Sequence, residues 1–140
     1  YFTVYGPRQR PDMAFHKFLR AIYAGGTIQR YGDGERTRDF TFVSDAVQAN
    51  VLAMDHGEAG EYFNIGGGSR VTLNHCLMLL QRVTGRELHT EHVESKPGDV
   101  RHTWADTTAA HETLEFHPQV SLEEGLERED AWFREVMLNR

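Results

Sequence analysis

Two short stretches of the sequence combine side chains that can recognise phosphate, ribose and a nucleobase. Tyr31 is followed by a glycine turn and then by two arginines, Arg36 and Arg38, all within one stretch of the chain. A guanidinium binds two phosphate oxygens at once, and an aromatic ring offers a flat stacking face. The second stretch has Lys96 and Arg101 on either side of Asp99, whose carboxylate can accept both hydroxyls of a ribose. These stretches predict a nucleotide site, and the equally weighted alternative is two exposed salt-bridge loops.

The other candidate motifs favour structural roles. Gly66, Gly67 and Gly68 follow an apolar segment, but neither Gly-x-Gly-x-x-Gly nor Gly-Lys-Ser/Thr occurs, so a tight turn is preferred over a phosphate loop. The 8 histidines lack zinc-ligand spacing, which predicts no metal site. Cys76 is the only cysteine, and it lies on the apolar face of an expected helix, where a thiol is typical of a core. No serine lies in a nucleophile-elbow motif.

Composition restricts the class of protein. The chain has 21 acidic and 15 basic residues and a net charge of −6, which argues against nonspecific binding of nucleic acid. Hydrophobic residues make up 39% of the 140, enough for the core of one domain spanning residues 1–140. The sequence contains no run of about 18 apolar residues and no signal-peptide pattern. We therefore expect a cytoplasmic protein with no membrane partner.

Alternating strands and helices must position the candidate residues. Apolar, β-branched and aromatic runs predict strands at residues 1–5, 27–31, 38–43, 61–65 and, more weakly, 88–93. Apolar residues at helical spacing predict helices that begin at Asp12, Ser44, Thr72, Asp106 or Thr107, and Ser121. The last of these has a capping box, Ser121-Leu122-Glu123-Glu124. The alternation favours an α/β or α+β fold.

Several segments also occur together in an order and spacing found in one enzyme family. They are YFTVYGPRQRPDMA at residues 1–14, YGDG at 31–34, TRDF at 37–40, VSDA at 43–46, FNIGGG at 63–68, PGDVR at 97–101 and VSLEEG at 120–125. This set resembles the extended short-chain dehydrogenase/reductases that act as NAD-dependent nucleotide-sugar epimerases and dehydratases. The similarity is greatest to UDP-glucose and UDP-glucuronate 4-epimerases, and it covers essentially the whole chain.

The resemblance implies an α/β fold that is the C-terminal portion of an extended Rossmann-type fold. This portion is a mixed α/β substrate-binding domain, with the last strands of the nucleotide-binding sheet but without the N-terminal dinucleotide-binding half. The family's glycine-rich NAD loop and its catalytic Tyr-x-x-x-Lys pair are absent from this sequence, and the chain opens at Tyr1 without a Met. We therefore assign no catalytic residue, and we expect the chain alone to be inactive and to bind NAD poorly.

The resemblance also implies a role for individual residues. Tyr1 and Phe2 correspond to positions beside the nicotinamide ribose. The residues implied for substrate binding are Thr3 at the sugar, Met13 near sugar and phosphates, Tyr31 on the uracil, Arg38 at the diphosphate, Lys96 in place of a family arginine, Asp99 at the ribose hydroxyls and Arg101 near the phosphates. Asp12 would repel a diphosphate, so we expect it to cap its helix.

The leading hypothesis is the substrate-binding portion of a UDP-sugar 4-epimerase. Alternatives are a fragment of a 4,6-dehydratase or decarboxylase, a freestanding non-catalytic module for UDP-sugar binding or assembly, and a stable fold without function. An isolated chain would expose apolar surface and sheet edges. The expected partners are therefore a nucleotide-sugar together with either a missing N-terminal half or a second copy of the chain.

Overall fold

A computed structural model describes residues 1–68, 70–94 and 100–139, and within them short strands form three two-stranded sheets. The strand pairs are β1 (Val4–Tyr5) with β4 (Thr41–Phe42), parallel; β2 (Thr27–Tyr31) with β6 (His89–Val93), parallel; and β3 (Thr37–Asp39) with β5 (Arg70–Thr72), antiparallel. The helices are α1 (Ala14–Tyr23), α2 (Val43–His56), α3 (Leu73–Thr84), α4 (Thr108–Leu114), α5 (Leu122–Phe133) and the π-helical turn η1 (Arg134–Leu138). The fold is mixed α/β.

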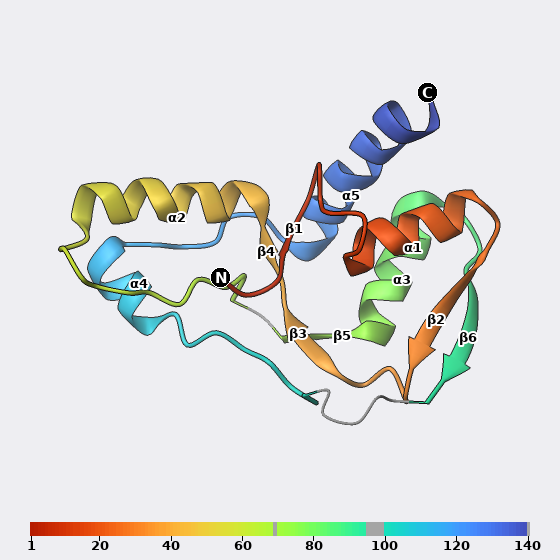
Figure 1. Ribbon diagram of the computed structural model, residues 1–140, viewed down its shortest axis with the longest axis horizontal. Helices are drawn as coiled ribbons and strands as arrows, with labels where there is room; N and C mark the ends of the chain where they lie inside the picture. The colour runs from red at the N-terminus through yellow and green to blue at the C-terminus, as the bar shows by residue number, and fades with distance from the viewer. Residues whose placement is uncertain (69, 95–99, 140) are drawn as a thin grey trace.

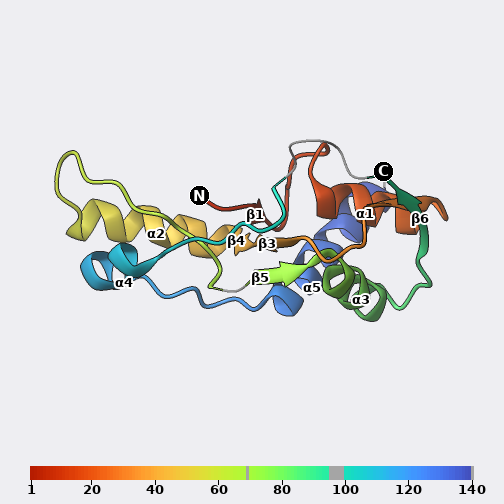
Figure 2. The ribbon, with the colours of Figure 1, turned by 90° about the horizontal axis from the view of Figure 1, so that it is seen from below.

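The elements form an elongated molecule with two ends joined by strands (Figure 1). Helices α2 and α4 lie side by side at one end, and α1, α3 and the β2–β6 pair lie at the other (Figures 1 and 2). Strands β1, β4 and β3 run between the two ends. Helix α5 packs against α3 and α1, so it fixes the end that carries the β2–β6 pair.

The larger core lies at that end and is rich in aromatic residues. The ring of Tyr5 meets those of Phe15 and Phe42 edge to face, with centroids 5.3 and 5.4 Å apart. Such pairs add to the stabilisation that comes from burial alone. Cys76 is fully buried in the same core, and burial raises the pKa of its thiol to about 12. This confirms Cys76 as a core residue rather than a nucleophile.

A smaller core joins α2 to α4. It consists of Ala49, Ile65, Ala110, Leu114 and Phe116, and each of these side chains is buried. No described helix has the length and hydrophobicity needed to cross a membrane.

Several predicted helix ends are confirmed. The Thr72 hydroxyl accepts a hydrogen bond from the His75 N–H at 3.1 Å at the start of α3. That helix ends at Gly85, whose φ of +64° suits a residue without a Cβ. The Ser121 hydroxyl accepts from the Glu124 N–H at 3.2 Å and caps α5. Each cap satisfies a backbone group that the helix itself leaves without a partner.

Other local predictions are wrong. Asp12 does not cap α1, because the N-cap is Met13, one residue later, and the Asp12 carboxylate pairs with Arg10 at 3.2 Å. Ser44 lies inside the first turn of α2, whose N-cap is Phe42. Residues 61–65 form no strand. Ile65 accepts one hydrogen bond from the Phe2 N–H, at 2.9 Å, but no strand ladder extends from it.

Candidate functional site

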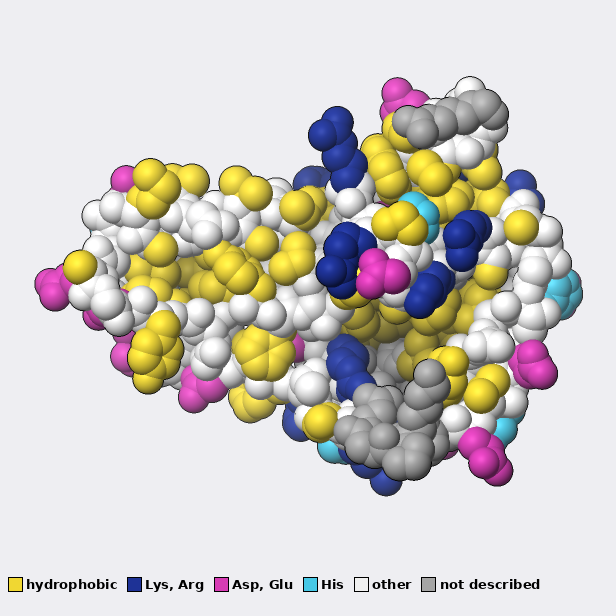
Figure 3. Space-filling view, in the orientation of Figure 1, with side chains coloured by type: hydrophobic (Ala, Val, Ile, Leu, Met, Phe, Trp, Pro, Cys, Tyr) yellow, Lys and Arg dark blue, Asp and Glu magenta, His cyan; other side chains and the backbone are white. Residues whose placement is uncertain are grey.

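A cavity of about 360 Å³ lies between α1 and the strands β2, β3 and β5. Its apolar wall includes Phe15, Phe18 and Phe40. Figure 3 shows Lys and Arg side chains gathered around a hollow with a hydrophobic floor on this face of the molecule. The combination of an apolar floor and a few charged groups is typical of small-molecule sites.

The secondary structure explains which side chains reach the cavity. Residues of a strand that are two apart share a face, so Gln29 and Tyr31 of β2 both line the cavity. The same alternation places Arg36 beside Arg38, on the extended segment that becomes β3. On α1, Ala14, Lys17 and Phe18 line the cavity because residues three and four apart share a helical face.

The charge of the cavity favours an anion. Lys17, Arg36 and Arg38 line it together with one carboxylate, that of Asp12. The Asp12 carboxylate is itself paired with Arg10, at 3.2 Å. Arg38 donates one hydrogen bond to the Thr37 carbonyl at 2.8 Å, which fixes part of its guanidinium fork. Among the described residues that line the cavity, basic side chains outnumber acidic ones, although the whole chain carries a charge of −6.

The structure brings three of the predicted substrate-binding residues together. Thr3, Tyr31 and Arg38 all line this cavity, although they come from three separate segments of the chain. Lys96 and Asp99 lie outside the described residues. For all five, the roles in ligand binding stay predictions.

Two further predicted substrate-binding residues do not line the cavity. Met13 lies between two residues that do line it, and its sulfur accepts a hydrogen bond from Arg10 at 3.5 Å. Arg101 pairs with Asp33 across 3.6 Å, and both side chains are exposed. Because Asp33 lies in the turn that follows Tyr31, this ion pair places Arg101 beside the first candidate stretch.

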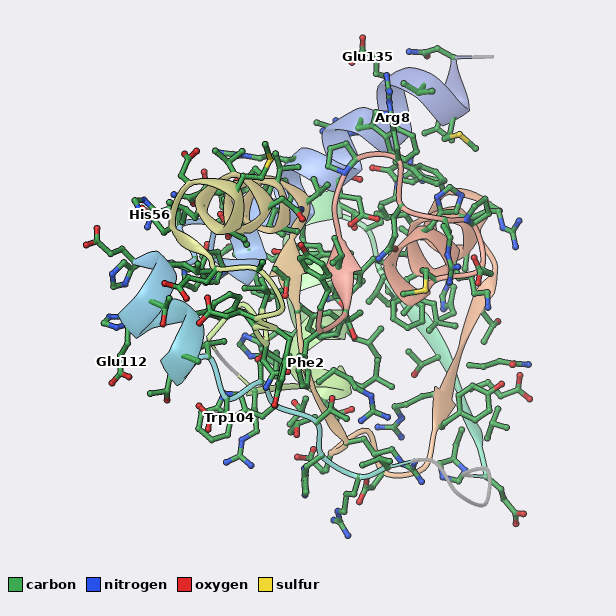
Figure 4. The ribbon with its side chains drawn as sticks, turned by 60° about the vertical axis from the view of Figure 1, so that its left-hand side comes forward. Phe2, Arg8, His56, Trp104, Glu112 and Glu135 are labelled. Carbon is green, nitrogen blue, oxygen red and sulfur yellow. The ribbon has the colours of Figure 1, made fainter. Side chains whose placement is uncertain are left out.

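The residues predicted to lie beside the cofactor, Tyr1 and Phe2, lie near the start of the chain in different surroundings. Tyr1 is 64% exposed, and its hydroxyl donates to Asn50 Oδ1 at 2.6 Å. Phe2 is half-buried among the side chains in the middle of the molecule, as the label in Figure 4 shows. The sequence provides no glycine-rich loop to hold a pyrophosphate. The roles of Tyr1 and Phe2 beside NAD stay predictions.

Sequence reasoning missed Lys17 as a residue of the cavity, and it placed Arg36 in the first candidate stretch without assigning it a role. Their signal was periodicity: Lys17 follows Ala14 by three residues on a helix, and Arg36 precedes Arg38 by two on an extended segment. Only the packing of α1 against the strands shows that the two periodic faces point into one space.

Sequence reasoning also missed a set of buried carboxylates that hold the loops. Asp39 is 1% exposed and accepts from the Gly67 N–H at 2.8 Å and the Ala105 N–H at 3.2 Å. A Cβ on Gly67 would collide with the Phe40 carbonyl oxygen, which explains a glycine at this turn. The tight-turn interpretation of the three glycines is thus confirmed.

A second carboxylate, Glu129, is completely buried beside the turn after β1. It accepts from the Gly6 N–H at 3.0 Å, and burial raises its pKa to about 8.

Within the described residues, no three His, Cys, Asp or Glu side chains converge as metal ligands would. His111 and His117 meet as a pair, with ring centroids 4.3 Å apart. The buried acids therefore serve the fold, and the cavity is the strongest candidate site.

Comparison with known proteins identifies relatives of this chain. Residues 1–66 match the model of the NAD dependent epimerase/dehydratase family. A UDP-glucuronate 4-epimerase of Thermodesulfobacterium geofontis is 37% identical over 136 residues, which are 96% of this chain and 42% of that protein. A UDP-N-acetyl-alpha-D-glucosaminuronate decarboxylase of Bacillus cytotoxicus is 34% identical over 145 residues, which cover 97% of this chain and 45% of that protein.

Solved structures give the same result. The UDP-glucuronic acid 4-epimerase of Bacillus cereus, in complex with UDP-glucuronic acid and NAD, superimposes with a TM-score of 0.91 at 38% identity. The match covers 97% of this chain and 44% of that one. The chain thus spans less than half the length of the relatives it matches, and its fold corresponds to the C-terminal part of the longer chains.

Proposed function

Because this chain belongs to the NAD-dependent epimerase/dehydratase family, we propose that it is the substrate-binding portion of a UDP-sugar 4-epimerase. The observation that carries the proposal is the cationic cavity into which Thr3, Tyr31 and Arg38 converge. An aromatic ring beside a guanidinium suits a base followed by a diphosphate, and a hydroxyl suits a sugar.

Within this site, Arg38 binds the diphosphate, Tyr31 packs on the uracil and Thr3 donates to or accepts from the sugar. Asp99 binds the ribose hydroxyls, Lys96 takes the place of a family arginine, and Arg101 lies near the phosphates. The Arg101–Asp33 ion pair supports the role of Arg101, because it places this residue beside the turn after Tyr31.

Activity requires a nucleotide-binding half that this chain does not contain. NAD is the cofactor of the family, and when bound it supplies reversible hydride transfer at the sugar. The chain has no Tyr-x-x-x-Lys pair for the accompanying proton transfer.

Two surface features support a further protein surface that covers this chain. Val47, Val51 and Met54 form an exposed apolar stripe on α2, and parallel strand pairs are normally part of larger, covered sheets.

Calorimetry with the chain alone tests the binding function. We expect UDP-glucose to bind with measurable heat in the absence of NAD⁺, and NAD⁺ alone to give none. Absence of UDP-glucose binding at millimolar ligand would contradict the proposal and favour a fold without function.

A second candidate is the equivalent portion of a decarboxylase or 4,6-dehydratase. The similarity to a UDP-N-acetyl-alpha-D-glucosaminuronate decarboxylase supports it. These reactions share nucleotide-sugar binding and differ in acids and bases that this chain lacks. A freestanding UDP-sugar-binding module would give the same calorimetric result. A mixing experiment separates the two: adding the nucleotide-binding half of a relative would produce no activity with a freestanding module. The cytoplasmic location remains a prediction from the sequence.

A further inference from the structure

Two exposed histidine rings meet at the end of helix α4. The ring centroids of His111 and His117 lie 4.3 Å apart, and the ring planes are inclined by 82°. His111 lies within α4, whereas His117 lies beyond the end of that helix. Their spacing along the sequence matches no zinc motif, so the fold rather than a local pattern brings the two imidazoles together.

The backbone after α4 holds the two histidines in place. Glu115 has a φ of +55°, and this left-handed residue turns the chain back on the helix. The Phe116 N–H then donates to the Ala110 carbonyl at 3.1 Å, and both of these residues are buried in the smaller core. Because Ala110 and Phe116 directly precede His111 and His117, the core fixes the position of each imidazole.

The separation of the rings suits a shared metal ion. Imidazole nitrogens bound to one ion lie about 2.0–2.1 Å from it, which places the ring centroids about 4.5–5 Å apart. The pair at 4.3 Å therefore needs only small side-chain rotations to bind an ion. Imidazole suits Zn²⁺, Ni²⁺ and Cu²⁺, whereas Mg²⁺ prefers oxygen ligands. Among the residues that the structure describes, no third His, Cys, Asp or Glu joins the pair, so water completes the coordination.

The charges at this end of the molecule favour a cation. Residues 39–69 and 102–127, which include α2 and α4, contain no Lys or Arg. Asp55 of α2 and Glu112 of α4 belong to these stretches, and Glu112 points outward from its helix in Figure 4. A surface whose charged side chains are all acidic attracts cations over a distance.

We propose that His111 and His117 form a binding site for one divalent transition-metal ion, which clamps the end of α4 to the segment that follows it. The proposal is independent of UDP-sugar binding. Because only the folded chain brings the two rings together, bound metal stabilises the folded state.

Calorimetry with NiCl₂, CuCl₂ and MgCl₂, on the chain without a polyhistidine tag, tests the site. We expect one Ni²⁺ to bind per chain, Cu²⁺ to bind more tightly, and Mg²⁺ to give no heat. The variants His111→Gln and His117→Gln should each bind Ni²⁺ about tenfold or more weakly, because a single imidazole lacks the advantage of two linked ligands.

A control variant separates the pair from exposed histidines in general. His89→Gln removes an exposed imidazole from β6, at the other end of the molecule (Figure 1), and should leave Ni²⁺ affinity unchanged. Electron paramagnetic resonance of bound Cu²⁺ should show two coordinating nitrogens in the unaltered chain and one in either pair variant. Circular dichroism must show the same fold for every variant.

Two outcomes overturn the proposal. Equal Ni²⁺ affinity in the unaltered chain and in both pair variants would show adventitious binding by scattered imidazoles. An unchanged melting temperature at saturating Ni²⁺ would show that no clamp forms, since an ion bound only by the folded chain must raise it. UDP-glucose binding is measured separately, so its failure leaves the metal site standing.

Discussion

Arg38 is the single residue on which the proposed binding function depends most. It comes from β3, lines the cavity beside Tyr31, and has part of its fork fixed by the Thr37 carbonyl at 2.8 Å. A guanidinium held in this way loses less freedom when a phosphate binds.

Replacing Arg38 by Ala should weaken UDP-sugar binding by about 1.5–3 kcal/mol, the range for a hydrogen bond to a charged group. Titration calorimetry measures the effect. Arg82→Ala is the control, because Arg82 pairs with Glu123 at the surface and does not line the cavity. An unchanged dissociation constant for Arg38→Ala would remove Arg38 from the site.

Glu129 makes stability depend on pH in the opposite direction to most acids. Burial raises its pKa from 4.5 to about 8, so between those values the folded chain holds a proton that the unfolded chain has released. Stability from this group is therefore full below pH 4.5 and falls as the pH rises toward 8. Glu129→Gln keeps an acceptor for the Gly6 N–H and removes the titration.

Urea unfolding at pH 5, 6, 7 and 8 should show the free energy of unfolding of the unaltered chain falling with pH more steeply than that of Glu129→Gln. Parallel curves for the two proteins would show that Glu129 does not titrate in this range. Cys76 and Tyr5 lie nearby, and their pKa values are raised further above neutrality, so neither changes charge in the window.

At the scale of elements, the turn at residues 66–68 connects the two ends of the molecule. Gly67 donates to buried Asp39 at 2.8 Å, and the Phe40 carbonyl occupies the space of any Cβ. The turn therefore depends on a missing side chain rather than on a bound phosphate.

Gly67→Ala should destabilise the chain by about 1–3 kcal/mol, the cost of forcing a methyl group into filled space. Gly26→Ala is the control, because a Cβ there meets only ordinary contacts, the nearest at 3.6 Å. Thermal and urea unfolding measure both. Equal stability of the two variants would contradict the close approach at Gly67.

At the scale of the whole molecule, the end formed by α2 and α4 has an incomplete covering. Met54 is 83% exposed on α2, and Val47 and Val51 lie along the same apolar stripe. Contact between this apolar stripe and water is unfavourable, so covering the stripe with another protein surface lowers the free energy of the folded chain. Trp104 is 59% exposed and points outward in Figure 4. The Arg70 guanidinium carbon lies 5.5 Å from the centroid of its ring, so the chain itself covers part of this side chain.

The isolated chain should self-associate through this stripe. The double variant Val51→Asp/Met54→Lys should shift the chain toward monomer, as measured by sedimentation velocity. Substitution of exposed Glu58 and Glu61 to Gln, beyond the same helix, should not. A monomer at all concentrations in the unaltered chain would contradict the expectation that this surface needs covering.

The chain alone should not interconvert UDP-glucose and UDP-galactose when NAD⁺ is supplied, because it lacks the proton-transfer pair and the dinucleotide loop. A coupled assay for UDP-galactose measures this. Turnover above background would show that the catalytic groups lie within these 140 residues.

The sequence by itself determined the order of helices and most strands, the caps at Thr72 and Ser121, and Arg38 and Tyr31 as binding candidates. These features depend on short-range periodicity, on capping chemistry and on a motif set that resembles a family. The cap expected at Asp12 is wrong because α1 begins one residue later than expected, with Met13 at the N-cap, and the Asp12 carboxylate pairs with Arg10.

Only the tertiary structure decided that Lys17 shares a cavity with Arg36 and Arg38, and that Asp39 and Glu129 are buried acids tied to glycine amides. The physical reason is that each relation joins segments far apart in the chain. Which of many exposed cations or acids meet is set by how α1, α3 and α5 pack, and packing depends on the whole core rather than on any local pattern.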